Sequence, residues 1–321
     1  MHKKIRTCVI GAGSMGSNHC RILSKISNLV GICDTDLTRA KSAAHQFNSV
    51  AFTSLSAMID SQKPQAVVVA VNTQYHAAIA LELIKNNIPL LVEKPIATTI
   101  IDAKKIVSAA KRKNVFLMVG MVERYNPTIV KIQQDIAKNI FGDIYQMVAL
   151  RVGISPPVMH PRSVDLDLSV HDVDIINYLL GEHPVSVRKI GNKHLEGSEL
   201  DTCSLTLGYK KMTATVISNW VSPVKIRRLY IFGEKISAEI NMLNQVIYYY
   251  SKIPLKAIAK GNYYVSFQEL GAYSRQISFK KSEPLVEELK VFLSRIESGY
   301  DGAFCENGLS ALTVLHKAKK Q

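Results

Sequence analysis

Hydrophobic and polar residues follow two different patterns along this chain, and the pattern changes near residue 122. In the first part, short apolar runs alternate with stretches in which apolar residues recur every three or four positions. That order is typical of a parallel sheet covered by helices. Strands are expected at 7–10, 29–33, 66–71, 89–92 and 115–120, and helices include 14–26, 76–85 and 98–113.

After residue 122 single apolar residues alternate with polar ones, a pattern typical of strands that bury one face. Such strands are expected at 145–152, 185–190, 202–207, 212–220 and 226–232, with helices following at 283–298 and 309–319. The pattern predicts an α/β chain whose N-terminal doubly wound parallel sheet is followed by a C-terminal α+β domain. That second domain is expected to contain a large open, mostly antiparallel sheet. The predicted boundaries are 1–122, 123–300 and a C-terminal helix at 301–321 that packs back on the body.

A glycine-rich run, GAGSMG at residues 11–16, links the first predicted strand to the first helix. Gly11 permits a tight turn, Gly13 lets the backbone approach phosphate groups, and Gly16 lets the helix pack closely. The N-terminus of the helix then faces an anion. The strand, turn and helix together predict a Rossmann domain that binds a dinucleotide. The expected cofactor contacts here are Gly11, Gly13, Ser14, Met15 and Gly16.

Asp34 ends the second predicted strand, 18 residues after Gly16. A carboxylate there accepts hydrogen bonds from the ribose 2′-hydroxyl and repels a 2′-phosphate, which favours NAD over NADP. The alternative, a glycine turn with a capping aspartate and no ligand, is disfavoured by the match of spacing and context.

Composition narrows the class of protein. A chain of 321 residues exceeds what one core usually supports, so two domains are expected. No apolar run is long enough to cross a bilayer, and Met1 to Lys4 lead directly into a strand, so a cytoplasmic protein that does not contact membranes is predicted. Five widely spaced cysteines predict buried thiols, with neither a metal site nor disulfides: Cys8, Cys20, Cys33, Cys203 and Cys305.

The chain is basic, with 40 Lys and Arg against 26 Asp and Glu and a net charge of +14. The basic residues are scattered, without an arginine-rich tail or the stacking aromatic motif of RNA-binding proteins, so nucleic acid is not an expected partner. Attraction for doubly phosphorylated ligands explains the excess more simply, although most individual lysines are explained equally well as surface charge.

Two further segments carry candidate chemistry. Glu93-Lys94-Pro95 follows a strand, so Lys94 is expected at the carboxyl end of the sheet, where ligands of doubly wound folds bind. Asp167 and His171 lie four residues apart at the start of a predicted helix and would share one face. A histidine can take a hydroxyl proton during oxidation. Taken alone, Lys94 is equally well explained as a surface residue, and Asp167 as a helix cap.

Three motifs in this order and spacing resemble the Gfo/Idh/MocA family of pyranose and inositol dehydrogenases: GxGxMGxxH at 11–19, EKP at 93–95 and DxxxHDxD at 167–174. The resemblance covers essentially the whole chain. It implies an NAD-binding domain followed by a substrate-binding and oligomerisation domain. It also implies that Lys94 and His171 lie beside the nicotinamide and the reacting hydroxyl, with either as the base, and that Asp167 holds the substrate. Further implied cofactor contacts are Asn72, which replaces a usual proline, Thr73, His76 and Glu93.

Within that family, residues 119–127 and 151–157 resemble members that oxidise the C3 hydroxyl of UDP-N-acetylglucosamine. This resemblance implies a UDP-3-oxo sugar, which related pathways pass to an aminotransferase during lipid A or surface polysaccharide synthesis. Implied substrate contacts are Arg124, Tyr125, Arg151, Arg162, Asp167 and His171, and candidates to meet the diphosphate include Lys225, Arg227 and Arg228. A dehydrogenase of a free sugar, inositol or diol is the alternative, and a catalytically silent NAD-binding regulator is another. A homodimer or homotetramer is expected, with Tyr248 to Tyr250 as a candidate interface.

Overall fold

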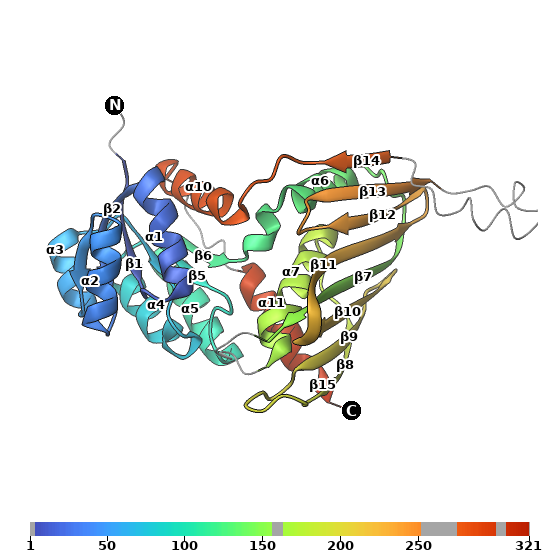
Figure 1. The fold of residues 1–321 in the computed structure, drawn as a ribbon, viewed down its shortest axis with the longest axis horizontal. Coiled ribbons are helices and arrows are strands. Elements are labelled where there is room, and N and C mark those ends of the chain that lie inside the picture. The colour runs from blue at the N-terminus through green and yellow to red at the C-terminus, as the bar shows by residue number, and fades with distance from the viewer. Residues whose placement is uncertain (1–3, 156–162, 252–274, 300–305, 321) are drawn as a thin grey trace, which may run out of the picture. The chain divides into compact units, whose positions relative to one another are not determined.

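The computed structural model describes residues 4–155, 163–251, 275–299 and 306–320. The chain forms two units (Figure 1). The first contains residues 1–122 and 283–313, and the second contains residues 123–282 and 314–321. In the part of the chain that is described, no helix is long and apolar enough to cross a membrane.

The first unit is a doubly wound sheet of six parallel strands in the order β3-β2-β1-β4-β5-β6. Its strands are β1 (Arg6–Ile10), β2 (Asn28–Cys33), β3 (Val50–Phe52), β4 (Ala66–Val69), β5 (Leu90–Glu93) and β6 (Leu117–Gly120). Its helices are α1 (Ser14–Ile26), α2 (Leu37–Gln46), α3 (Leu55–Gln62), α4 (His76–Lys85), α5 (Ile100–Lys113) and α10 (Pro284–Glu297). Every residue of β4, β5 and β6 is buried, as expected for strands covered on both faces. The predicted Rossmann sheet is confirmed.

Helix α10 belongs to the first unit, whereas the sequence pattern placed residues up to 300 in the second domain. The ring of Phe292 stacks on Phe116 with centroids 5.9 Å apart. Glu283, just before α10, forms an ion pair with Arg21 of α1, and Figure 1 shows α10 beside α1. The apolar face of α10 therefore completes the core of the Rossmann unit.

The second unit contains a nine-stranded sheet in the order β14-β13-β12-β11-β7-β10-β9-β8-β15. Among the described strands, β7 with β10 and β8 with β15 pair in parallel and the other neighbours pair antiparallel, so the predicted open, mostly antiparallel sheet is confirmed. Its strands are β7 (Ile144–Ile154), β8 (Ser186–Asn192), β9 (Thr202–Gly208), β10 (Thr213–Asn219), β11 (Val221–Gly233), β12 (Ile236–Asn241), β13 (Val246–Ser251), β14 (Arg275–Ser278) and β15 (Lys319–Lys320).

Helices α6 (Pro127–Ala137) and α7 (Val170–Leu180) belong to the second unit, and α7 packs against β7, β10 and α6. Helix α11 (Glu306–Lys317) begins in the first unit and ends in the second. Tyr249 is buried and its hydroxyl donates to Asp135 of α6 (2.5 Å). Tyr248 and Tyr250 are half-buried on the opposite face of β13.

The cysteines of the described residues, Cys8, Cys20, Cys33 and Cys203, are free and buried. Burial raises the pKa of Cys8 and Cys20 to about 12, so both thiols stay protonated at neutral pH. Cys305 lies outside the described residues. Among the residues that are described, no three His, Cys, Asp or Glu side chains cluster as a metal site.

Candidate functional site

The turn between β1 and α1 has the geometry that a dinucleotide diphosphate requires. Gly11 has φ of +97°, and a side chain there would come within 2.3 Å of the Ala70 carbonyl oxygen. A side chain at Gly16 would come within 1.8 Å of the Gly11 carbonyl oxygen. Gly13 caps α1 without a side-chain acceptor, and a Cβ there would meet no atom within 4 Å. Gly13, Ser14 and Met15 are exposed, so the N-terminal amides of α1 are accessible to phosphate oxygens.

Valine at Gly13 should weaken NAD binding by about 100-fold, because the side chain would occupy the space that phosphate needs and remove charge-assisted hydrogen bonds. The melting temperature of the cofactor-free protein should stay unchanged, since that space contains no protein atom. Valine at Gly16 is the matched control: it collides with backbone and should destabilise the first unit by about 3 kcal/mol or more. Fluorescence titration with NADH and thermal melts measure both effects, and wild-type affinity in Gly13→Val would contradict this placement of the diphosphate.

Asp34 lies directly after β2, where it accepts hydrogen bonds from three donors. The Ala12 amide donates to Oδ2 (2.8 Å), and the Asp36 amide and the Arg39 guanidinium donate to Oδ1 (both 2.9 Å). Burial opposes ionisation, but these donors outweigh it and lower the pKa of Asp34. The carboxylate is thus charged and fixed beside the glycine turn, as recognition of a ribose hydroxyl requires. Arg39, which holds it, is a residue that sequence reasoning missed.

Lys94 begins the loop that leaves β5 and is half-buried. Two neighbouring side chains brace this loop. Glu93 accepts hydrogen bonds from His19 Nε2 (2.7 Å) and from the Lys94 amide (3.1 Å). His76 places its ring nitrogens 2.9 Å from the Pro95 carbonyl oxygen and 3.0 Å from that of Val71. Both residues were predicted as cofactor contacts, but in the structure their polar atoms position the Lys94 loop.

The electrostatics of the two bracing residues differ. Burial alone would raise the pKa of Glu93, but the His19 hydrogen bond and the nearby Lys94 charge lower it below its ordinary value. Burial lowers the pKa of His76 despite its carbonyl neighbours. Glu93 is therefore an anion at neutral pH, and it accepts the hydrogen bond of the Lys94 amide.

Asn72 and Thr73 lie in the loop that leaves β4, where Asn72 is exposed and Thr73 half-buried. The predicted cofactor residues of the first unit therefore follow β1, β2, β4 and β5. Because these strands are parallel, their carboxyl ends share one edge of the sheet. The structure thus brings the predicted cofactor residues together at this edge.

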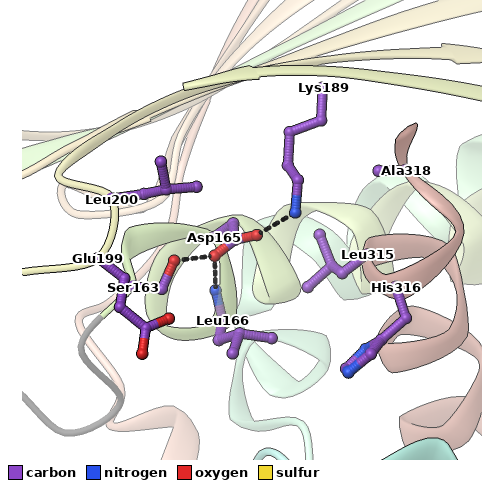
Figure 2. A pocket seen from close by; sticks show the side chains of 9 residues that line it. All are labelled: Ser163, Asp165, Leu166, Lys189, Glu199, Leu200, Leu315, His316 and Ala318. Carbon is purple, nitrogen blue, oxygen red and sulfur yellow. Dashed lines mark hydrogen bonds and ion pairs between the residues drawn. The ribbon is translucent and has the colours of Figure 1, made fainter. Parts of the chain in front are cut away.

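In the second unit, Asp167 lies on a π-helical turn, Asp165–Ser169, and His171 follows in the first turn of α7. Helix α7 begins at Val170, so Asp167 is not its cap. Asp165 fixes the turn: it accepts hydrogen bonds from Ser163 and from Lys189 Nζ (2.8 Å), as Figure 2 shows. A cavity of about 280 Å³ adjoins this ion pair. Asp165 and Lys189 are paired with each other, and Glu199 and His316 also line the cavity.

Two arginines predicted to contact substrate lie instead in buried ion pairs. Arg124 donates through Nε and Nη2 to Asp174 (both 2.6 Å). Arg151 donates to both oxygens of Asp172 (2.8 and 3.0 Å) and to Glu123 (2.7 Å). These ion pairs compensate the charges of Arg124 and Arg151 inside the second unit. Both side chains therefore stabilise the fold of this unit. Tyr125 is half-buried in the turn Val122–Tyr125, and Arg162 lies outside the described residues.

Asp167 borders a second cavity, of about 320 Å³. It is lined by Gly153, Ile154, Asp167, Leu168, Trp220, Lys225 and Arg227. Lys225 and Arg227 were predicted to meet a diphosphate, and here they share a cavity with the predicted substrate residue. Arg228 does not line this cavity; it pairs with Glu239 of β12 (3.3 Å). The second unit thus contains a largely apolar cavity at which an acid and two basic side chains come together.

Comparison with known proteins agrees with these features. Residues 5–121 match the model of an oxidoreductase family with an NAD-binding Rossmann fold, and residues 130–239 match the GFO/IDH/MocA C-terminal domain. The chain is 26% identical to UDP-N-acetylglucosamine 3-dehydrogenase of Acidithiobacillus ferrooxidans, over 98% of this chain and 95% of that protein. It is 23% identical to myo-inositol 2-dehydrogenase of Thermotoga maritima, over 98% and 96%. A solved structure of the Acidithiobacillus ferrooxidans enzyme superposes with a TM-score of 0.85 at 24% identity, over 98% of this chain and 96% of that one.

Proposed function

Because this chain belongs to the GFO/IDH/MocA family of NAD-binding oxidoreductases, we propose that it oxidises a sugar ring hydroxyl, specifically C3 of UDP-N-acetylglucosamine. The observation that carries this proposal is the similarity to UDP-N-acetylglucosamine 3-dehydrogenase, which runs over 98% of the chain. The cavity at Asp167, with cations beside an acid, suits a hydroxylated ligand that carries negative charge.

The chemistry assigned to the chain's own residues is proton transfer and charge stabilisation. NAD, when bound along residues 11–16 and Asp34, supplies the hydride acceptor. Asp167 orients the sugar by accepting a hydrogen bond from a hydroxyl. His171 takes the proton of the reacting hydroxyl, and the Lys94 ammonium stabilises the developing alkoxide. If Lys94 takes the proton and His171 stabilises the alkoxide instead, the overall reaction is the same. Only substitution of each residue separates the two assignments.

Oxidation of a neutral polyol is the second candidate, because similarity to myo-inositol 2-dehydrogenase also extends over 98% of the chain. The same lysine, aspartate and histidine serve both reactions. The two candidates differ in charge: a nucleotide sugar carries a diphosphate, whereas inositol carries none.

The deciding experiment mixes purified protein with NAD⁺ and UDP-N-acetylglucosamine and follows NADH absorbance. One arm adds an aminotransferase with glutamate to remove a 3-oxo product, and another adds 2-oxoglutarate to recycle NADH. Substrate-dependent NADH or a 3-amino sugar supports the proposal. If no arm gives NADH or a 3-amino sugar, and free sugars or inositols do give NADH, the second candidate is supported instead. Delivery of product to an aminotransferase and assembly as a dimer or tetramer belong to the same proposal, and light scattering measures the assembly.

A further inference from the structure

An irregularity in the central sheet of the second unit forms one wall of the Asp167 cavity. Strands β7 and β11 pair so that Val221 faces Ile154 and Ile226 faces Val152. Residues 222–225 therefore stand opposite Gly153 alone, as a bulge in β11. Such bulges redirect side chains and are frequent beside active sites.

The sequence of the bulge explains its shape. Pro223 has no amide to donate to the sheet, and the Ser222 hydroxyl closes the loop by donating to the Val224 carbonyl oxygen (2.9 Å). Gly153 leaves room beneath it: a Cβ there would lie 3.9 Å from Lys225 Cγ and 4.0 Å from Arg227 Nη1. The bulge thus brings Lys225 to the same cavity as Arg227.

Arg227 is held in place by backbone carbonyl groups. Its Nη1 donates to the carbonyl oxygens of Val152 (2.6 Å) and Ile226 (2.8 Å). Within the residues that the structure describes, Arg227 forms no ion pair, whereas Arg124, Arg151 and Lys189 each have a carboxylate within 2.8 Å. Carbonyl groups fix the orientation of the guanidinium but do not neutralise it.

The charge of Arg227 persists at neutral pH. Burial and the neighbouring Arg151 lower the pKa of Arg227, but only to about 10. A half-buried, oriented cation is thus present in the cavity, with Asp172, Glu123 and Asp167 near enough to act on it but, among the described residues, no carboxylate at ion-pair distance. An oxyanion of a ligand would supply that direct ion pair.

We propose that Arg227, assisted by Lys225, binds an oxyanion of the substrate while Asp167 in the same cavity binds a sugar hydroxyl. The inference rests on the proposed function, in which the oxyanion is the diphosphate of the nucleotide sugar. A cavity of about 320 Å³ accommodates a pyranose with an adjoining phosphate. Arg227 thereby becomes the residue that distinguishes a charged substrate from a neutral polyol.

The test is calorimetric titration of the NADH-loaded protein with UDP, which requires no turnover. Arg227→Gln should weaken UDP binding by about 10- to 100-fold, and Arg227→Lys should restore part of it. Lys225 is exposed, so Lys225→Gln should cost about 2- to 5-fold. Arg228→Gln is the matched control: it removes the neighbouring positive charge, and affinity should stay within about twofold. Unchanged melting temperature and NADH affinity in Arg227→Gln show that the fold is intact.

Further ligands separate failure of this inference from failure of the proposed function. If Arg227→Gln binds UDP like the wild type and still oxidises UDP-N-acetylglucosamine with unchanged KM, the oxyanion site is overturned and the function stands. If a hexuronic acid binds in an Arg227-dependent manner and UDP does not bind, the oxyanion site stands and the nucleotide-sugar substrate is rejected. If only inositol or a neutral sugar is oxidised, with KM unchanged in Arg227→Gln, both are rejected.

Discussion

Alanine at Lys94 should lower kcat by about 1000-fold or more while NADH binds with wild-type affinity. The ammonium lies at the carboxyl end of β5, on the sheet edge that the glycine turn and Asp34 also occupy. Removing it takes away both a proton donor or acceptor and the charge that stabilises an alkoxide, and each effect alone is worth a factor of about 100 or more. Single-turnover absorbance of NADH measures the chemical step directly.

A control variant and the contacts of the Lys94 loop make the expected loss of kcat specific to the Lys94 side chain. Lys104→Ala on the exposed face of α5 is the matched control, and its kcat should equal that of the wild type. Glu93 and His76 hold the loop through Lys94's own amide and through backbone carbonyl groups, so loss of the side chain leaves these contacts in place. Wild-type turnover in Lys94→Ala would overturn the mechanism.

A second variant separates the two possible bases. If His171 takes the proton, His171→Asn should become faster as pH rises, because hydroxide replaces the missing base. If Lys94 takes the proton, Lys94→Ala should show that rise instead. The pH profiles of kcat for both variants thus assign the roles that sequence alone left open.

Features encoded in neighbouring residues were predicted well. The helices at Ser14–Ile26 and His76–Lys85 have the predicted bounds, because their apolar periodicity and glycine or asparagine boundaries are local signals. The glycine turn and Asp34 were likewise found, since their spacing along the chain reflects one strand, turn and helix. Lys225 and Arg227 were candidates for diphosphate binding because of their charge, but the cavity that they line depends on a bulge in strand pairing.

Features that depend on distant partners could not be predicted. Asp172 and Asp174, within the motif at 167–174, pair with Arg151 and Arg124, which lie 21 and 50 positions earlier. Arg151 is in phase with the buried Met147 and Ala149 of β7, but nothing local indicates which helix packs there. Arg124 lies in the turn Val122–Tyr125, where no strand or helix periodicity applies. Helix α10 was placed with the wrong unit for the same reason, since its partner Phe116 lies far earlier in the chain.

Methionine at Arg151 should destabilise the second unit by about 3–5 kcal/mol, the largest effect on folding that we expect from a single side chain. Arg151 is 2% exposed and forms three hydrogen bonds to Asp172 and Glu123. Without it, both carboxylates lose their bound cation in a buried environment, and the remaining nearby charge, on Arg227, is not hydrogen-bonded to either.

A double variant shows whether the cost comes from the lost bond or from the uncompensated charge. Arg151→Met with Asp172→Asn should be less destabilised than the sum of the two single variants, because the neutral amide no longer requires a counter-ion. Arg188→Met, on the exposed face of β8, is the matched control and should change the free energy of unfolding by less than about 0.5 kcal/mol. Urea unfolding of the variants measures each value. Strict additivity in the double variant would show that Arg151 stabilises the unit through packing rather than through its charge.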